Sequence, residues 1–461
     1  MKSLTSYTIR NIFFIVLLVL SSNHTISQLS DYKDVGVIIN ENSQTSIDIG
    51  NYFKQERNIP NENIIYVNAP TTEVIDSLEF ENIRVQIEDY LISNELEDSI
   101  NYIVTTKGVP LKVERENCTS IQGFNCHPFD AEIALILGDY ESYVSEPNTM
   151  NSLWNPYFNL NKNFSREEFG FYLVTRLDAY SKEDVFELID RSAIGLEVDK
   201  AKVQTILDIS KYGAYSVKDA FNNRIEPAYD YLKSENWNVT YDKNASVLTD
   251  QTDVFAYSMF IGDSDHFDGK LNNTWLEGSI STLFHYHSAM TFDKSNNPDN
   301  YLLIADFIEE GATASHSFAY MPSLSHSLRP NILYERYFDT ENNFNLAESY
   351  YMADPFLAWQ SVVIGDPKAW VNVTSTLSVS DLNNNEHDIK VFPNPSSGVV
   401  NIEGDNIEKI TVYDMKGVSV YEKDENSEKL NVDLSFLKSG VYHFAITTNK
   451  NVIRKRVILS K

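Results

Sequence analysis

Three aspartates, Asp263, Asp265 and Asp268, stand close together just after a predicted strand and just before Gly269. Carboxylate oxygens at such spacing are typical ligands of Ca²⁺. However, Gly269 does not occupy the sharp-turn position of an EF-hand, and no glutamate stands at the closing position. The sequence therefore allows a calcium site or a solvated acidic loop, and the missing glutamate favours the loop. No cofactor is predicted other than this candidate calcium ion.

A second group of candidate ligands is the pair His285 and His287, which lie two residues apart at a predicted strand end. Side chains at positions i and i+2 of a strand point to the same face. Together with a carboxylate such as Asp263 or Asp293, the pair could hold a metal ion. The alternative is a strand-end pair that is hydrogen-bonded to backbone, which is the commoner arrangement. His316 and His326 flank a further loop, which would line a pocket if one lies at this sheet edge.

The two cysteines of the chain, Cys118 and Cys126, bracket a short loop. In an oxidising compartment such a pair is expected to form a disulfide. Cys126 and His127 could instead suggest a reactive thiol with its base. Neighbours on an extended chain point to opposite faces, so the disulfide is favoured.

These residues must be positioned by an alternation of strands and helices. Buried-strand patterns at Asp34–Asn40, Ile64–Asn68 and Tyr102–Thr105 alternate with helical patterns at Ser43–Asn58 and Ile83–Asn94. Strand–helix alternation predicts a mainly parallel sheet with right-handed crossovers, flanked by helices. The pattern continues with strands over 171–176, 201–208, 255–262, 280–287, 312–318 and 359–364, and helices over 182–192, 221–235 and 301–310. Residues 113–165 have no such pattern and are predicted to be an insertion.

The end of the chain has a different pattern. A rigid turn is predicted for the segment that contains Phe392, Pro393, Asn394, Pro395 and Gly398. Proline has no backbone N–H to donate to a neighbouring strand, and glycine can adopt positive φ. Short segments rich in Val, Ile and Tyr follow, at 399–403, 409–414, 419–423, 430–433, 440–447 and 452–459. This spacing predicts a small antiparallel β-sandwich.

The motifs Val391–Pro395, Val412–Gly417 and Leu437–Tyr442 resemble the C-terminal sorting domain of the type IX secretion system. The resemblance implies the type IX machinery as a partner and export across the periplasm to the outer cell surface or the medium. We expect a signal peptide over 1–27, a body over 28–373, a linker over 374–388 and a sorting domain over 389–461. Lys2 and Arg10 before the apolar run Ile12–Leu20 support the signal peptide.

Composition narrows the choice of partners. The chain has 66 acidic and 37 basic residues, and a formal net charge of −29. Such a surface repels phosphate backbones, which argues against nucleic acid as a partner. Beyond the signal peptide, the sequence contains no apolar segment long enough to span a bilayer.

The body also resembles a known group. Thr105–Leu111, Tyr172–Asp178, Glu310–Ala314 and Val363–Pro367 resemble successive motifs of an uncharacterised family of exported bacterial proteins, with distant similarity to the gingipain and caspase-like fold. In that fold, a histidine follows one strand and a cysteine follows the next. The resemblance places His266 at the histidine position and Ser288 where the thiol would be. Losing the thiol removes the cysteine mechanism, because serine needs a stronger base and an oxyanion hole.

Three functions remain open at this point. The first is an exported protein whose body binds a ligand without catalysis. The second is a secreted hydrolase of the peptidase type that uses the strand ends around His266 and Ser288. The third is a carbohydrate-binding or carbohydrate-processing protein, because the chain has 27 Tyr and 5 Trp. The sequence favours the first.

Overall fold

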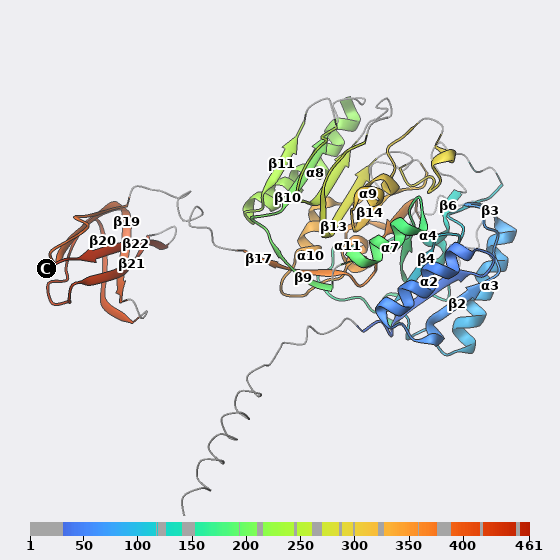
Figure 1. The fold of residues 1–461 in the computed structure, drawn as a ribbon, viewed down its shortest axis with the longest axis horizontal. Helices are drawn as coiled ribbons and strands as arrows, with labels where there is room; N and C mark the ends of the chain where they lie inside the picture. Colours follow the sequence, from blue (N-terminus) through green and yellow to red (C-terminus); the bar gives the residue numbers. More distant parts are fainter. Residues whose placement is uncertain are drawn as a thin grey trace, which may run out of the picture. The chain divides into compact units, whose positions relative to one another are not determined.

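The computed structural model describes residues 31–116, 118, 126–140, 153–192, 194–209, 215–243, 247–260, 270–284, 288–297, 300–320, 327–357, 359–375, 389–414, 418–448 and 452–461. The predicted signal peptide and most of the predicted linker lie outside these ranges. The chain divides into two compact units, Met1–Thr374 and Ser375–Lys461 (Figure 1).

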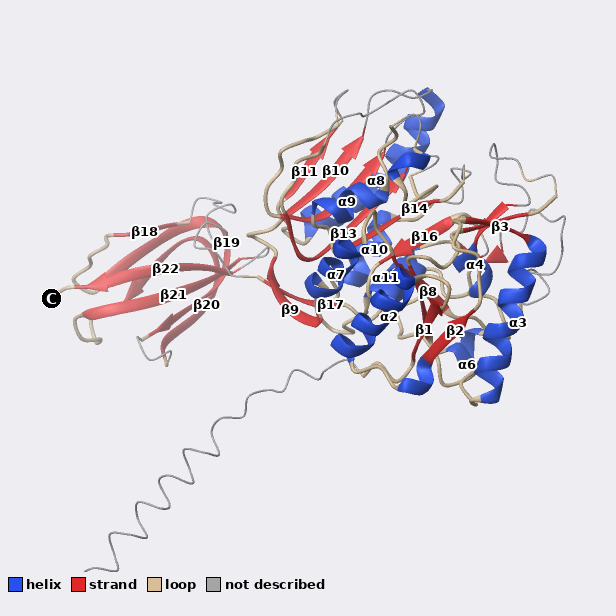
Figure 2. Cartoon of the chain, turned by 45° about the vertical axis from the view of Figure 1, so that its right-hand side comes forward, coloured by secondary structure: helices blue, strands red, loops and turns tan. Residues whose placement is uncertain are grey.

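A ten-stranded sheet forms the centre of the first unit, with strand order β11-β10-β12-β13-β14-β16-β8-β4-β1-β2 (Figure 2). Every neighbouring pair is parallel except β14 and β16. The strands are β1 Val35–Asn40, β2 Ile64–Val67, β4 Tyr102–Thr106, β8 Leu173–Leu177, β10 Gln204–Ile209, β11 Val239–Asp242, β12 Val254–Phe260, β13 Trp275–Phe284, β14 Ala314–Phe318 and β16 Ser361–Ile364. The predicted mainly parallel α/β class is therefore confirmed.

The central strands are buried on both faces, as expected for a parallel sheet covered by helices. All residues of β1, β4, β8, β12 and β14 are buried. The helices are α2 Gln44–Arg57, α3 Ser77–Ser93, α4 Phe129–Ile133, α6 Arg166–Phe169, α7 Lys182–Arg191, α8 Tyr215–Ser234, α9 Ile304–Glu310, α10 Pro330–Tyr337 and α11 Leu346–Ala353. The chain passes from β1 through α2 to β2, and then returns through α3 to β4 on the other side of β1. With right-handed crossovers, this reversal places α2 and α3 on opposite faces.

Several helix boundaries differ from the sequence prediction. The segment 346–351, for which no helix was predicted, lies in helix α11, which begins with a capping box between Asn345 and Glu348. Helix α3 starts at Ser77 rather than Ile83, because Asp76 and Glu79 form another capping box. Helix α10 was not predicted at all. Capping signals rather than hydrophobic periodicity therefore mark the helix starts missed at Ser77 and Leu346.

Three small sheets complete the first unit: β3 Val74–Asp76 with β5 Lys112–Glu114 and β6 Cys126–Pro128, β7 Leu153–Trp154 with β15 Phe356–Leu357, and β9 Ile194–Asp199 with β17 Trp370–Thr374. Thus the segment 113–165, predicted to be irregular, contains β6, α4, β7 and the end of β5. These strands are two to three residues long within that segment, too short to produce an alternating pattern in the sequence.

The second unit is an antiparallel five-stranded sheet with its own apolar core, formed by β18 Lys390–Phe392, β19 Val399–Tyr413, β20 Ser419–Asp433, β21 Gly440–Thr448 and β22 Val452–Leu459. Four of the predicted short strands are in fact two long ones, β19 and β20. Their pairing shifts register between Glu403 and Ile407, where Asn406 has a φ of 52°. The polar residues between the predicted strands 399–403 and 409–414 therefore lie at an irregularity within one long strand and do not separate two strands.

The proline-rich segment lies along β22. The side-chain amide of Asn394 donates to the carbonyl of Arg456 at 2.7 Å and accepts from the backbone N–H of Ile458 at 2.8 Å. Gly398 has a φ of +145°, and a Cβ there would lie 2.8 Å from the Ser435 hydroxyl. The rigid turn predicted for this segment thus fixes it at the sheet edge and requires glycine at position 398.

Candidate functional site

The predicted site lies at the carboxyl edge of the large sheet. Most of the predicted site residues lie outside the described residues, namely Asp263, Asp265, His266, Asp268, His285, His287 and His326. The calcium site and the pairing of His266 with Ser288 therefore stay predictions. Among the described residues, no group of three His, Cys, Asp or Glu side chains is arranged to hold a metal ion.

Ser288 begins a described segment that follows β13. Its side chain is fully buried. The hydroxyl donates to the carbonyl of Leu302 at 2.7 Å, and the Ser288 carbonyl accepts from the N–H of Ile304 at 2.8 Å. These bonds join the segment after β13 to the start of α9. To act as a nucleophile, the hydroxyl would have to leave this hydrogen bond and become accessible.

The crevice between β1 and β4 is the place where ligands commonly bind in an open α/β sheet, since the strand order reverses there. A pocket of about 250 Å³ lies at the carboxyl ends of these strands. Its lining combines hydroxyls with charged groups: Ser43, Thr45, Thr71, Thr72, Glu73, Lys107, Gly108, Val109, Leu111, Asp178 and Asp293. Of these residues, Asp293 was named as a candidate metal ligand, whereas the others had no predicted role. Lys107 lies two residues after the predicted strand Tyr102–Thr105.

The charged groups around this pocket are mostly paired with one another. Lys107 donates through Nζ to Asp178 at 3.1 Å and to the carbonyl of Phe292 at 3.1 Å. Glu73 accepts from the Thr291 hydroxyl and from the N–H of Phe292, each at 2.6 Å. These contacts hold the segment after Ser288 against Lys107, which follows β4, and against Glu73, which precedes β3. They leave little unpaired charge for chemistry.

Arg176, in β8, is fully buried and is the largest of the fully buried side chains in the described part of the chain. Its Nε and Nη2 donate to the two carboxylate oxygens of Asp130 at 2.9 and 2.7 Å, and its Nη1 lies 3.3 Å from Asp178. The carbonyls of Val109 and Pro110 accept its remaining donors. A buried charge is tolerated only with such a complete set of partners. The arginine inside the apolar run Leu173–Leu177 was the sequence signal for this ion set.

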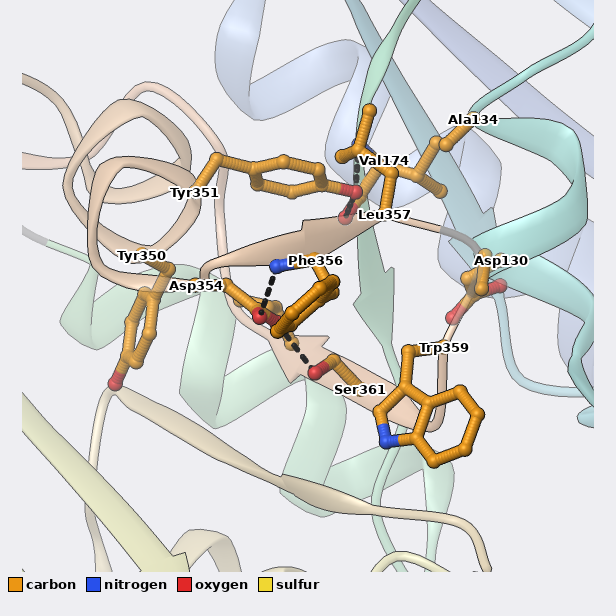
Figure 3. Close-up of a pocket in the computed structure, with 12 residues that line it drawn as sticks. Asp130, Ala134, Val174, Tyr350, Tyr351, Asp354, Phe356, Leu357, Trp359 and Ser361 are labelled. Atoms are coloured by element: carbon orange, nitrogen blue, oxygen red, sulfur yellow. Dashed lines mark hydrogen bonds between the residues drawn. The ribbon is translucent and has the colours of Figure 1, made fainter. Parts of the chain in front are cut away.

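A small cavity lies beneath α11, between α4 and the start of β16 (Figure 3). Its volume of about 30 Å³ suits one or two water molecules rather than an organic ligand. Asp354 faces it, and its carboxylate accepts from the Ser361 hydroxyl and from the N–H of Phe356 (Figure 3). Burial raises the pKa of Asp354 to about 7, and those two hydrogen bonds limit the rise.

The raised pKa of Asp354 should make the free energy of unfolding depend on pH. The folded protein keeps a proton on Asp354 that the unfolded chain loses above pH 4, so this stabilisation is present at low pH and is lost as the pH rises towards 7. We expect Asp354→Asn to match the wild type near pH 4 and to be more stable near pH 8, by on the order of 2–4 kcal/mol. Urea unfolding across this range measures the difference.

The control for this prediction is Asp433→Asn, which changes an exposed aspartate whose pKa is lowered by the Ser435 hydroxyl and backbone N–H. Its stability relative to wild type should not rise with pH. Parallel stability curves for Asp354→Asn and the wild type would show that Asp354 titrates normally.

The remaining predicted groups have structural surroundings. Cys118 and Cys126 form a disulfide, so Cys126 is not a free thiol beside His127. His316 is fully buried in β14, with Nδ1 3.1 Å from the Thr282 hydroxyl. Burial lowers its pKa to about 3, which keeps the imidazole neutral. It therefore lies in the core rather than in a loop pocket.

Comparisons with known proteins identify the second unit. Residues 390–460 match the family described as secretion system C-terminal sorting domain. The chain is 30% identical over 112 residues to ulvan lyase NLR42 of Nonlabens ulvanivorans, a match that covers 24% of this chain and 21% of that protein. The chain thus spans about a fifth of that relative's length.

Solved structures of gingipains are among those similar to the chain. One is the Arg-specific cysteine proteinase gingipain R, with 12% identity, coverage of 94% of this chain and 99% of that one, and a TM-score of 0.39. Another is the complex of the pro- and mature domains of RgpB from Porphyromonas gingivalis, with 13% identity, coverage of 92% and 100%, and a TM-score of 0.38. At these scores the similarity supports no inference about activity.

The chain is therefore an exported protein that carries a type IX sorting domain. That domain directs it to the cell surface or the medium and makes the type IX machinery its partner. None of the helices in the described part of the chain has the length and hydrophobicity needed to cross a membrane.

Proposed function

We infer that the exported body acts by binding a ligand and does not hydrolyse it. The observation that supports this most directly is Ser288, whose hydroxyl is buried and donates to the carbonyl of Leu302. A nucleophilic serine must be accessible to substrate and must contact a base. In addition, ion pairs join Lys107 and Arg176 to Asp178, and Arg176 to Asp130. Charges that neutralise one another in this way suit a rigid scaffold more than a catalytic centre.

The alternative is a peptidase-like hydrolase built on His266 and Ser288. The two functions differ in what Ser288→Ala should do. We expect neither the wild type nor this variant to cleave fluorescently labelled casein. The variant should lose about 1 kcal/mol of stability, because the carbonyl of Leu302 loses its buried hydrogen-bond donor. Cleavage is measured by fluorescence release, and stability by urea unfolding.

Ser317→Ala is a matched control for this experiment. Ser317 is equally buried, and its hydroxyl donates to the carbonyl of Leu283 at 2.7 Å. If both hydroxyls are structural, the two variants should lose similar stability and show the same lack of cleavage. Casein cleavage by the wild type that persists in Ser317→Ala and disappears in Ser288→Ala would establish the hydrolase instead.

A further inference from the structure

A large cavity of the body lies at the amino ends of the strands, on the edge opposite to the predicted site. It is open, with a volume of about 630 Å³, a size typical of small-molecule sites. Asp34 and Asn101, which directly precede β1 and β4, line it together with the first turn of α11 and the strands β9 and β17. It shares no residue with the carboxyl-edge pocket or with the cavity beside Asp354.

One wall of this cavity is aromatic. Trp370, in β17, is half-buried, and its ring lies against Gly195 of β9. A Cβ at Gly195 would be 2.8 Å from Cζ2 of the indole, and Gly195 has a φ of +70°, so glycine is needed for this packing. An indole packed against backbone, with part of its surface still accessible, provides a rigid apolar platform at low entropic cost.

Beside this platform lie polar side chains that the protein itself does not use. Glu197 and Asn372 are register partners on β9 and β17, so they lie next to each other on one face. With Asn343, they line the cavity. Within the described part of the chain, these three side chains form no hydrogen bond or ion pair. They therefore present free acceptors and amide donors to a ligand.

The charge of the cavity limits the class of ligand. Four carboxylates line it, from Asp31, Asp34, Glu197 and Glu348, against the single cation Lys368. Lys368 is already bound to Asp34 at 2.6 Å and to the carbonyl of Asp31 at 2.6 Å. Glu348 is committed to the N–H groups of Phe164 and Asn345. An anionic ligand would be repelled, whereas a neutral ligand with many hydroxyls would satisfy both the carboxylate and the amides.

We propose that this amino-edge cavity binds a short neutral saccharide, with the apolar face of one sugar ring on Trp370 and its hydroxyls on Glu197, Asn372 and Asn343. The inference rests on the proposed function, because it names the ligand class of a body that binds without catalysis. Sugar hydroxyls both donate and accept, which matches the mixture of one free carboxylate and two amides. Their C–H faces pack on indole rings in the manner of other apolar groups.

The test is isothermal titration calorimetry of the full mature chain with cellobiose, maltotriose, laminaritriose and xylotriose, and with trigalacturonate as an anionic probe. At least one neutral probe should bind saturably, and trigalacturonate should not. Trp370→Ala should weaken binding about tenfold. Trp154→Ala is the matched control, because Trp154 is 58% exposed but lies outside the cavity. That variant should bind as the wild type does.

Glu197→Gln and Asn372→Ala provide a second measurement if Trp370→Ala does not fold, and each should also weaken binding. Absence of heat with every neutral probe, or equal weakening by Trp370→Ala and Trp154→Ala, would overturn the saccharide site and leave the non-catalytic proposal standing. Preferred binding of trigalacturonate would overturn the neutral class. New reducing ends in the titrated mixtures would instead overturn the non-catalytic proposal, so the two failures are distinguishable.

Discussion

A chain that lacks residues 389–461 is expected to accumulate in the periplasm and to be missing from the cell surface. The deletion removes the whole sorting domain, which spans 390–460. It should leave the body folded, because the two apolar cores share no residue. The core of the body ends at Val371, and that of the sorting domain begins at Ile389. Surface protease accessibility and periplasmic fractionation of cells expressing each form measure the effect.

Two controls make this result specific. Phe436→Ala removes a side chain that is 66% exposed and outside the sorting core, and it should be exported normally. Tryptophan fluorescence should show that the truncated body is folded, since Trp154, Trp237, Trp275, Trp359 and Trp370 all belong to it. Normal amounts of truncated protein at the surface would mean that another segment carries the sorting signal.

Arg176→Met is expected to be the most destabilising single substitution considered, at about 3–5 kcal/mol. Methionine fills a similar volume but leaves the buried carboxylate of Asp130 without its bidentate partner. It also leaves the carbonyls of Val109 and Pro110 without donors. The cost is that of an uncompensated buried charge rather than of a lost attraction. Urea unfolding followed by tryptophan fluorescence reports on the body alone.

Lys162→Met is the matched control for Arg176→Met. Lys162 pairs with Glu168, but both side chains are 49% exposed, so this pair should contribute less than about 1 kcal/mol. The double variant Arg176→Met with Asp130→Asn should recover part of the stability, because the stranded carboxylate is gone. A loss for Arg176→Met no larger than that for Lys162→Met would show that the ion set is solvated and not buried.

Much of the body's secondary structure could be predicted from local patterns. The strands β1, β4 and β8 are apolar on both faces and stand between recognisable helices, so the mainly parallel sheet followed from their order. The short strands β6, β7 and β15 were missed because two or three residues carry no periodicity. Helix α8, predicted over 221–235, begins earlier, at Tyr215, and contains Pro227 in its interior.

The sites were predicted less well than the fold. Ser288 could be placed near a strand end, but its burial and its bond to Leu302 depend on how α9 packs. Asp354, Arg176 and the cavity around Trp370 had no predicted role. The ion set of Arg176 and the cavity around Trp370 depend on groups more than 40 residues apart in the chain, Arg176 with Asp130 and Gly195 with Trp370. The raised pKa of Asp354 depends on its burial in the fold. No local pattern records such a contact.

The sequence by itself determined the destination of the protein and the order of most of its elements. The destination depends on the Phe392–Gly398 turn and the strands that follow it. The order of the elements depends on the short apolar runs of the body. Only the tertiary structure decided that β16 enters antiparallel to β14 and beside β8, that the charges of the carboxyl edge neutralise one another, and that unused amides gather at the opposite edge. Burial and long-range pairing fix these features, because the free energy of a charge or an amide depends on what the fold brings beside it.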